Sequence, residues 1–395
     1  MISEKMIKLA AGNSAIRAMF EEGNRLAALY GRENVYDFSL GNPNFPAPPV
    51  VKEAIFDILE QEESTMVHGY MSNAGYADVR TAVAQSLNSR FATDYGAENI
   101  LMTVGAAGGL NVILKTLLNP GDEVLAVAPY FVEYANYVAN FDGVLRAVPA
   151  LPDTFLPDMD AIAAAISPKT KAIIIDTPNN PTGVVYDEKT VAALAAVLDR
   201  CQKELGTSIY LLADEPYREL CYDGAKAPWL PAFYKNTVVC YSWSKSLSLP
   251  GERIGYLVLP AALDDAALIQ NAAAIATRVL GFVNAPSLMQ RTVARCLGTQ
   301  TDVAAYDANR QLLYKGLTDC GFSCVYPHGA FYLWVKSPDT DEKRFVERAK
   351  AYNLLLVPGS AFAGPGYVRL AYCVSPDMIR RSLPAFQKLA AEYKL

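Results

Sequence analysis

Short apolar runs alternate with helical patterns through the middle of the chain, and this alternation limits the possible folds more than any other feature. Five such runs are expected to form strands, at residues 123–127, 172–175, 210–213, 237–241 and 255–259. Between two of them, residues 191–205 carry apolar side chains at positions 191, 194, 197 and 198, the spacing of an amphipathic helix. Strands that alternate with helices form a mostly parallel sheet covered on both faces. The sequence therefore predicts an α/β fold.

The last third of the chain has a mixed pattern, which indicates a second, smaller domain of α+β type. Helices are predicted at residues 310–317, 343–352 and 376–393, and strands at 330–335, 354–357 and 368–371. A helix near the N-terminus, about residues 14–30, is expected to pack on this domain. We therefore predict a large domain formed by residues 46–290 and a small domain formed by residues 1–45 together with 291–395.

Composition and charge exclude several classes of function. A net charge of −6 without a run of Lys and Arg argues against nucleic acid as a partner. Charges at Glu4 and Lys5 argue against a secretory signal, and polar residues break the longest apolar stretch, 261–290, so no membrane span is expected. Seven scattered cysteines without metal-ligand spacing indicate reduced thiols and a cytoplasmic location. Because His68 and His328 are the only histidines, a lysine or a cofactor is favoured over a Ser-His-Asp triad or a metal site.

Four segments follow predicted strands, the apolar run 100–103 included, at the edge of a parallel sheet where ligands bind. The first is residues 242–245, Ser-Trp-Ser-Lys, with Arg253 a little further on. Desolvation and a neighbouring cation lower the pKa of a buried lysine, which makes its free amine a nucleophile suited to Schiff-base chemistry. Ser242, Ser244 and Arg253 could donate hydrogen bonds to a phosphate group. Taken alone, Lys245 would more commonly be a surface lysine in a loop.

The other three segments also have a structural and a functional interpretation. Asp214, in 214–217, could be structural, as a helix cap or a member of an ion pair. It could also be functional, as the partner of a protonated pyridine nitrogen. Asn180, in 180–183, fits either a turn or an amide held rigidly beside a cofactor. The glycine-rich residues 105–109 fit either a tight turn or a phosphate seat at the start of a helix.

The four segments occur together in an order that resembles the class I and II aminotransferases. These are fold-type I enzymes that use pyridoxal 5′-phosphate (PLP) and include aspartate aminotransferase. Residues 242–255 look like the lysine signature of that family, and 180–183 and 214–217 match two further hallmarks. The resemblance extends from Ser39 to Arg369. It implies a PLP-dependent aminotransferase whose large domain holds a mostly parallel sheet, beside a smaller α+β domain.

The resemblance also implies roles for residues around the cofactor ring. Lys245 would form the Schiff base and move a proton between the substrate Cα and the cofactor. Asp214 would pair with the ring nitrogen, and Asn180 and Tyr217 would hold the phenolic oxygen. Phe131 would stack on the ring, where many relatives have a tryptophan.

The phosphate would be bound by the backbone of Gly105, Ala106 and Ala107 and by the side chains of Ser242, Ser244 and Arg253. Many relatives carry side-chain phosphate ligands in the 105–107 turn, which this chain lacks. Tyr70 resembles the tyrosine that reaches the phosphate of a neighbouring subunit, so we expect a homodimer with shared active sites. Gly41 and Asn180 would contact the substrate, and Arg369 would clamp its α-carboxylate through a two-pronged ion pair.

The identity of the substrate depends on a second cation, because a buried carboxylate without a partner is strongly disfavoured. Arg278 lies near the spacing of the arginine that binds the distal carboxylate from the partner chain in this family. Arg17 lies in the N-terminal segment that often lines the pocket entrance. Either residue could equally be a solvated helix charge. We predict aspartate or another acidic amino acid as donor and a 2-oxo acid such as 2-oxoglutarate as acceptor.

Two alternatives share the same cofactor residues. One is an aminotransferase for aromatic or hydrophobic amino acids. The other is a PLP-dependent carbon-sulfur β-lyase, which would release pyruvate and ammonia instead of transferring nitrogen. A regulatory module that senses PLP would need a DNA-binding segment, for which this chain has neither room nor basic charge.

Overall fold

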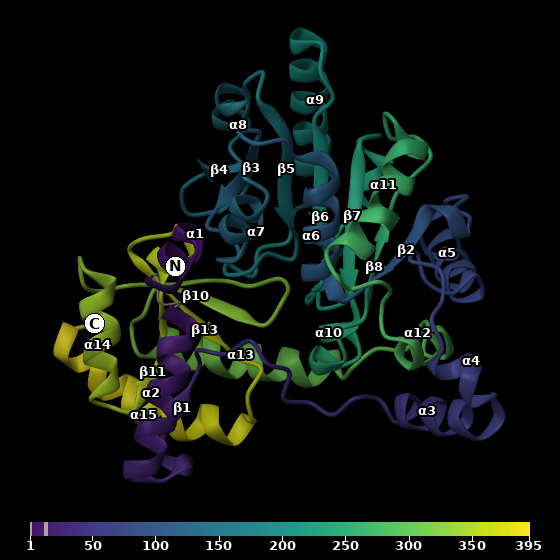
Figure 1. Cartoon of the computed structure of the whole chain (residues 1–395). Coiled ribbons are helices and arrows are strands. Elements are labelled where there is room, and N and C mark those ends of the chain that lie inside the picture. Colours follow the sequence, from purple (N-terminus) through teal and green to yellow (C-terminus); the bar gives the residue numbers. More distant parts are fainter. Residues whose placement is uncertain (1, 12–14) are drawn as a thin grey trace.

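A computed structural model of the chain describes residues 2–11 and 15–395, and at residues 8, 11, 15–18 and 20 it describes the backbone alone. A large sheet with helices on both faces forms one body, and a smaller body with its own sheet lies below and to the left of it in Figure 1. The predicted α/β fold class is therefore confirmed. Among the described residues, no helix combines the length and apolar character needed to cross a membrane.

The large sheet has seven strands, and all but one run in the same direction. Its order is β2-β8-β7-β6-β5-β3-β4. The strands are β2 (Ile100–Thr103), β8 (Gly255–Val258), β7 (Thr237–Ser242), β6 (Tyr210–Asp214), β5 (Thr170–Asp176), β3 (Glu123–Ala128) and β4 (Val144–Pro149). β8 runs opposite to the other six strands, so its pairings with β2 and β7 are antiparallel and the remaining pairings are parallel. Each of the five strands predicted at 123–259 is present, whereas the edge strand β4 was not predicted.

Alternating side chains of the central strands enter two different cores, as expected for strands buried on both faces. In β5, Ile173 and Ile175 pack into one hydrophobic cluster, whereas Ile174 packs into the other. The first cluster includes the helices α3 (Pro49–Gln61), α5 (Ala77–Phe91), α8 (Met159–Ala165), α9 (Glu188–Leu205) and α12 (Ser287–Arg295). The second includes α6 (Gly105–Leu117), α7 (Tyr134–Asn140) and α11 (Ala266–Val279). The sheet is thereby fixed from both sides, and its carboxyl edge stays free for a site.

The smaller body is built on an antiparallel sheet with the order β12-β13-β10-β9. These strands are β12 (Val357–Pro358), β13 (Tyr367–Ala371), β10 (Tyr332–Lys336) and β9 (Cys324–Val325). A short parallel pair joins β1 (Tyr36–Asp37) to β11 (Leu354–Leu355). The helices are α13 (Val303–Asp319), α14 (Glu342–Lys350) and α15 (Pro376–Tyr393). The predicted α+β pattern of the C-terminal third is therefore present.

The N-terminal helix α2 (Ala15–Tyr30) packs on the smaller body, as its predicted position required. Its Leu26 forms a small buried cluster with Val35 and Leu355. Figure 1 shows α2 beside β11. The predicted domain boundary at residue 290 falls within α12, and the division of the chain at residues 46 and 290 remains a prediction.

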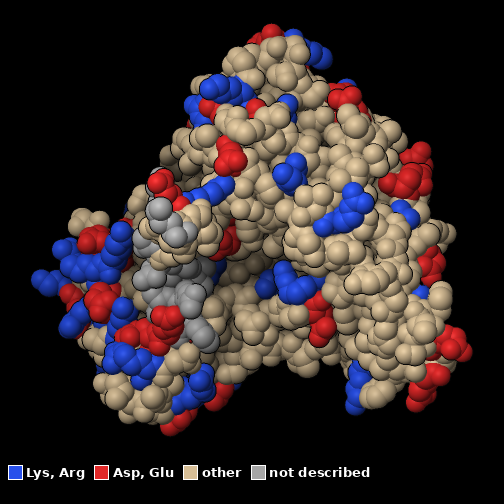
Figure 2. Space-filling view, viewed as in Figure 1, with Lys and Arg blue, Asp and Glu red and all other residues tan. Residues whose placement is uncertain are grey.

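Figure 2 shows acidic and basic side chains interspersed over one face of the molecule, with a hollow between the two bodies. Lys and Arg side chains lie beside this hollow. The strands β5, β6 and β7 end toward the smaller body, so the hollow and the carboxyl edge of the sheet lie in the same part of the molecule.

Candidate active site

A cavity of about 260 Å³ lies at the carboxyl edge of the large sheet. Residues at or just after the ends of β5, β6 and β7 and at the start of α6 form one wall, and Gly41, Tyr332 and Arg369 contribute from the smaller body. The lining includes most of the residues predicted for the site: Gly41, Ala106, Ala107, Phe131, Asn180, Asp214, Tyr217, Ser242, Ser244, Lys245, Arg253 and Arg369. Gly105 is adjacent to this lining, next to Ala106. The cavity is therefore shared by both bodies.

Lys245 reaches this cavity because the chain turns sharply where β7 ends. Ser242 caps the short helix α10 (Trp243–Ser246), and its Oγ accepts a hydrogen bond from the backbone N–H of Ser244 at 3.1 Å. The Lys245 Nζ donates to the backbone oxygen of Gly41 at 2.8 Å and lies 5.2 Å from the centre of the Phe331 ring. The amine is thus held by a backbone contact from the other body.

The pKa of Lys245 is lowered from 10.5 to about 8. Burial is the main cause, because it disfavours the ammonium form, and the positive charges of Arg253 and Arg369 act in the same direction. The nearby Cys373 opposes this shift. A lysine with such a pKa presents a useful fraction of free amine near neutral pH, as a nucleophile requires.

Gly41 is required because no side chain fits at this position. A Cβ built there would lie 2.0 Å from the hydroxyl oxygen of Tyr332. That hydroxyl is itself 2.8 Å from the hydroxyl of Tyr217. Tyr332 was not predicted as a site residue, since an aromatic residue at the start of a strand is usually part of a core.

The start of α6, here called the anion seat, presents backbone amides at one end of the cavity. Gly105 has a φ of +76°, and a Cβ there would lie 2.9 Å from the Arg253 Nη2. Among the described residues, no side chain caps this helix, so the amides of its first turn, including Ala106 and Ala107, are available to an anion. The hydroxyls of Ser242 and Ser244 lie 2.6 Å apart beside it. These donors fit a phosphate group.

Two buried carboxyl groups lie at the ends of neighbouring strands. Asp214, at the end of β6, accepts a hydrogen bond from the Tyr134 hydroxyl at 2.7 Å through Oδ2. Asp176, at the end of β5, accepts the backbone N–H of Asn180 at 2.8 Å through Oδ2. The Oδ1 atom of each is buried and has no hydrogen-bond partner among the described residues. Burial raises the pKa of Asp214 to about 7, against the hydrogen bond from Tyr134.

These open acceptor atoms fit a cofactor with a protonated ring nitrogen, because a buried acceptor without a donor is destabilising. Asp176 was not predicted as a site residue. It directly precedes the Thr-Pro-Asn-Asn-Pro segment, and in the sequence it looks like the last residue of an ordinary strand.

Arg369 lies on β13 and is only 2% exposed. Its Nη1 donates to the Asn180 Oδ1 at 3.0 Å, and its Nη2 donates to the Ser39 backbone oxygen at 2.7 Å. The guanidinium lies between two aromatic rings, 4.4 Å from the centre of Tyr332 and 4.6 Å from that of Phe362. This packing fixes a planar cation at the edge of the cavity.

Besides Gly105, three predicted residues are not part of the described lining. Tyr70 follows α4 (Ser64–His68) and is 91% exposed. Arg278 is exposed in the last turn of α11. Arg17 belongs to α2, but its side chain lies outside the described residues. The roles assigned to these three residues remain predictions.

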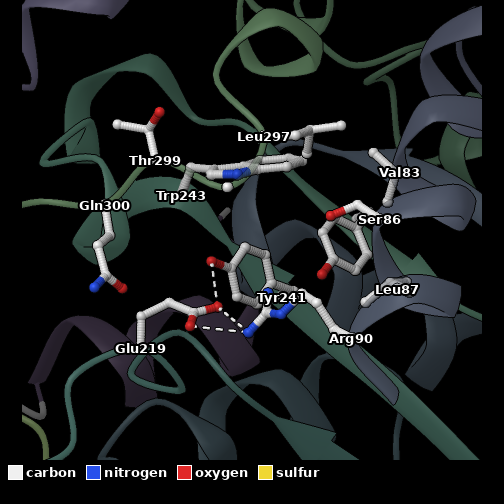
Figure 3. Close-up of a pocket in the computed structure, with 12 residues that line it drawn as sticks. Val83, Ser86, Leu87, Arg90, Glu219, Tyr241, Trp243, Leu297, Thr299 and Gln300 are labelled. Carbon is white, nitrogen blue, oxygen red and sulfur yellow. Dashed lines mark hydrogen bonds and ion pairs between the residues drawn. The ribbon is translucent and has the colours of Figure 1, made fainter. Parts of the chain in front are cut away.

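A second cavity of about 370 Å³ lies behind the lysine turn (Figure 3). The Tyr241 hydroxyl donates to the Ser246 Oγ at 2.8 Å, and the same tyrosine faces the ion pair between Arg90 and Glu219. The Trp243 ring packs edge-on against Tyr241 with centroids 5.5 Å apart. This network supports α10 through its residues Trp243 and Ser246.

The α/β fold and the buried lysine between an anion seat and an arginine define a lysine-centred cofactor enzyme. A family model described as "Aminotransferase class I and II" matches residues 33–386, and the chain belongs to this family. It is therefore a PLP-dependent aminotransferase. The chain is 32% identical over 351 residues to a probable aspartate/prephenate aminotransferase of Thermus aquaticus, covering 88% of this chain and 89% of that protein.

Solved structures agree with this membership. An aminotransferase from Eubacterium rectale has a TM-score of 0.98 and 44% identity, over 100% of both chains. Aspartate aminotransferase from Thermus thermophilus, solved with maleate, has a TM-score of 0.86 and 30% identity, over 98% of this chain and 99% of that chain. The resemblance identified from the sequence is therefore confirmed for family, fold and cofactor.

Proposed function

We propose that this enzyme moves the amino group of an acidic L-amino acid, such as aspartate, to a 2-oxo acid such as 2-oxoglutarate. Lys245 is the residue that binds PLP. One observation carries the proposal. The Lys245 amine, the open Oδ1 of Asp214 and the buried guanidinium of Arg369 converge on one cavity beside the anion seat of α6.

The residues around the cavity would hold the cofactor in one orientation. PLP supplies, when bound, an aldehyde that captures amines and a ring that accepts electron density from the substrate Cα. Asp214 would accept the ring N–H through its open Oδ1, while Tyr134 keeps its other oxygen fixed. Asn180 and Tyr217 would donate to the phenolic oxygen, and Phe131 would cover the ring face. The α6 amides, the serine hydroxyls and Arg253 would bind the phosphate.

Arg369 and Lys245 would then act on the substrate itself. Arg369 would bind the α-carboxylate through its planar fork, which orients the Cα–H bond toward the lysine. With substrate bound, the amine of Lys245 would be free. Its Nζ would accept the proton from the substrate Cα and later release it. Its lowered pKa suits both steps, because a base near the working pH can accept and release a proton.

Recognition of an acidic side chain would require a further cation. Among the described residues, the cations that line the cavity are Lys245, Arg253 and Arg369, and each already has a role. We therefore assign the distal carboxylate to Arg17 or to the partner subunit's Arg278. An exposed Arg278 at the end of α11 is consistent with a reach into a second copy.

A homodimer would also explain an unusual set of exposed apolar side chains. Tyr70 is 91% exposed, and other exposed apolar residues lie on α3, α4 and α11, namely Phe56, Leu59, Met66, Leu268, Ile275 and Val279. Contact with a second copy would bury such side chains, and it would bring Tyr70 to the partner's phosphate seat.

A second candidate is transfer from aromatic amino acids. The cavity lining includes the aromatic residues Phe131, Tyr137 and Tyr332. Among the described residues, it includes no cation besides Lys245, Arg253 and Arg369. This composition favours an apolar or aromatic substrate side chain over an acidic one unless Arg17 or the partner subunit's Arg278 takes part.

The test is a half-reaction followed by absorbance. Purified holoenzyme is mixed with L-aspartate or L-phenylalanine, and the visible cofactor band should fall with the true donor and return on addition of 2-oxoglutarate. Either Arg17→Gln or Arg278→Gln should slow the reaction with aspartate and spare the reaction with phenylalanine. A band that responds only to phenylalanine would refute the acidic assignment. Steady release of pyruvate and ammonia from a sulfur amino acid without acceptor would point to β-lyase activity.

A further inference from the structure

Asp176 brings a second buried carboxyl group to the end of the cavity that holds Asp214. Strands β5 and β6 pair so that Asp176 lies directly opposite Asp214. Both residues line the cavity, and each keeps one buried oxygen without a hydrogen-bond partner among the described residues. Within the described part of the chain, neither carboxyl group forms an ion pair. The nearby cation Arg218 is paired with Glu215 instead.

A role in the loop alone does not explain the chemistry at this position. The Asp176 Oδ2 accepts the Asn180 backbone N–H at 2.8 Å, which fixes the start of the Asn180 turn. An asparagine would accept the same hydrogen bond through its side-chain oxygen. The loop therefore needs neither the second oxygen of Asp176 nor its ionisable proton.

The surroundings of Asp176 disfavour two negative charges. The titratable groups near the pair are a carboxyl group, phenols and a thiol: Glu215, Tyr134, Tyr137, Tyr186, Tyr217, Tyr332 and Cys240. The cations of the same cavity wall are Lys245, Arg253 and Arg369. Adjacent buried carboxyl groups titrate as a pair, since ionisation of one makes ionisation of the other harder. Burial, followed by the charge of Asp214, raises the pKa of Asp176 well above its usual range.

We propose that Asp176 and Asp214 form a carboxyl pair that retains a proton at neutral pH, and that Asp176 is a positioning residue which donates this proton to Asp214 in a hydrogen bond. The pair then carries one negative charge, matched to one ring N–H of the cofactor. The part that concerns the ring rests on the proposed function, whereas the shared proton is a property of the chain itself.

The shared proton can be measured without the cofactor. Apoprotein labelled with ¹³C-aspartate should show the infrared carbonyl band of a protonated carboxyl group at pH 8. Asp176→Asn keeps the acceptor for Asn180 and should abolish the band. As a matched control, Asp187→Asn replaces a helix-capping aspartate that accepts the Thr190 N–H at 2.8 Å and has a lowered pKa, so it should leave the band intact.

A second variant keeps the test valid if Asp176→Asn does not fold. Tyr134→Phe removes the donor that stabilises ionised Asp214, so the protonated-carboxyl band at pH 8 should intensify. Absence of the band in the wild type, its survival in Asp176→Asn, or no change in Tyr134→Phe would each overturn the carboxyl pair. Failure of the apoprotein to bind added PLP would instead refute the proposed function and leave the infrared result standing.

Discussion

The rate at which apoprotein captures PLP should follow the ionisation of Lys245. Burial lowers the pKa of this amine from 10.5 to about 8. That change corresponds to about 3.4 kcal/mol of destabilisation of the ammonium form. At pH 7 about one molecule in ten would then carry the free amine, compared with about one in three thousand for an exposed lysine. At this pH we therefore expect the rate of PLP capture to be about 300-fold higher than the rate for a lysine with an ordinary pKa.

The assay is stopped-flow absorbance of apoprotein mixed with PLP between pH 6 and pH 10. The rate constant is divided at each pH by that of a simple model amine, which removes the titration of PLP itself. The ratio should be greatest at low pH and should fall as pH rises above about 8, because the model amine continues to gain free base there. Lys245→Ala should give no lysine-bound band at any pH.

One result would refute the reasoning. If the ratio stayed constant from pH 6 to pH 10, Lys245 would titrate like an exposed lysine, and burial at Phe331 and Gly41 would not control its reactivity. A flat ratio together with normal PLP binding would separate this failure from a loss of the site.

The other predictions concern single contacts. Arg369→Lys keeps the charge but loses the planar fork that reaches Asn180 and Ser39, so kcat/KM should fall about 100- to 1,000-fold in steady-state assays; unchanged kinetics would contradict the clamp. Gly41→Ala forces a methyl group onto the Tyr332 hydroxyl, and the free energy of unfolding in urea should fall by about 1–3 kcal/mol; an unaltered midpoint would mean that Tyr332 moves freely. Tyr241→Phe removes the 2.8 Å bond to Ser246 and should cost about 1 kcal/mol in the same urea assay, with the visible cofactor band retained.

The central strands could be predicted because they are buried on both faces. Residues 172–175 and 210–213 are uninterrupted apolar runs, and in the structure their side chains alternate between two cores. The edge strand β4 was missed because its side chains are mostly exposed or half-buried and Arg146 interrupts the run. A strand at the edge of a sheet is under weaker apolar constraint, so its sequence carries a weaker signal.

The site could be predicted only where a local motif marks it. Lys245, Asp214 and Asn180 stand in distinctive segments directly after strands, and all three line the cavity. Tyr332 and Asp176 lie in segments that look like ordinary strands, and their place at the site depends on strand pairing between distant parts of the chain. The functions assigned to Tyr70 and Arg278 need a second copy of the chain.

The fold itself explains why Asp214, and not its neighbour Glu215, is available to the cofactor. Successive residues at the end of β6 point in opposite directions, and Glu215 forms a buried pair with Arg218. Arg218 also donates to the Ala227 and Pro228 backbone oxygens, both at 2.9 Å, so that pair is internally satisfied. Among the described residues, Asp214 has a hydrogen-bond partner on one oxygen, the Tyr134 hydroxyl. A buried charge without a partner is destabilising, and at the end of β6 the oxygen without a partner, Oδ1 of Asp214, lies on the cavity side. A ligand with a ring N–H removes that penalty on binding, and by linkage it stabilises the folded enzyme.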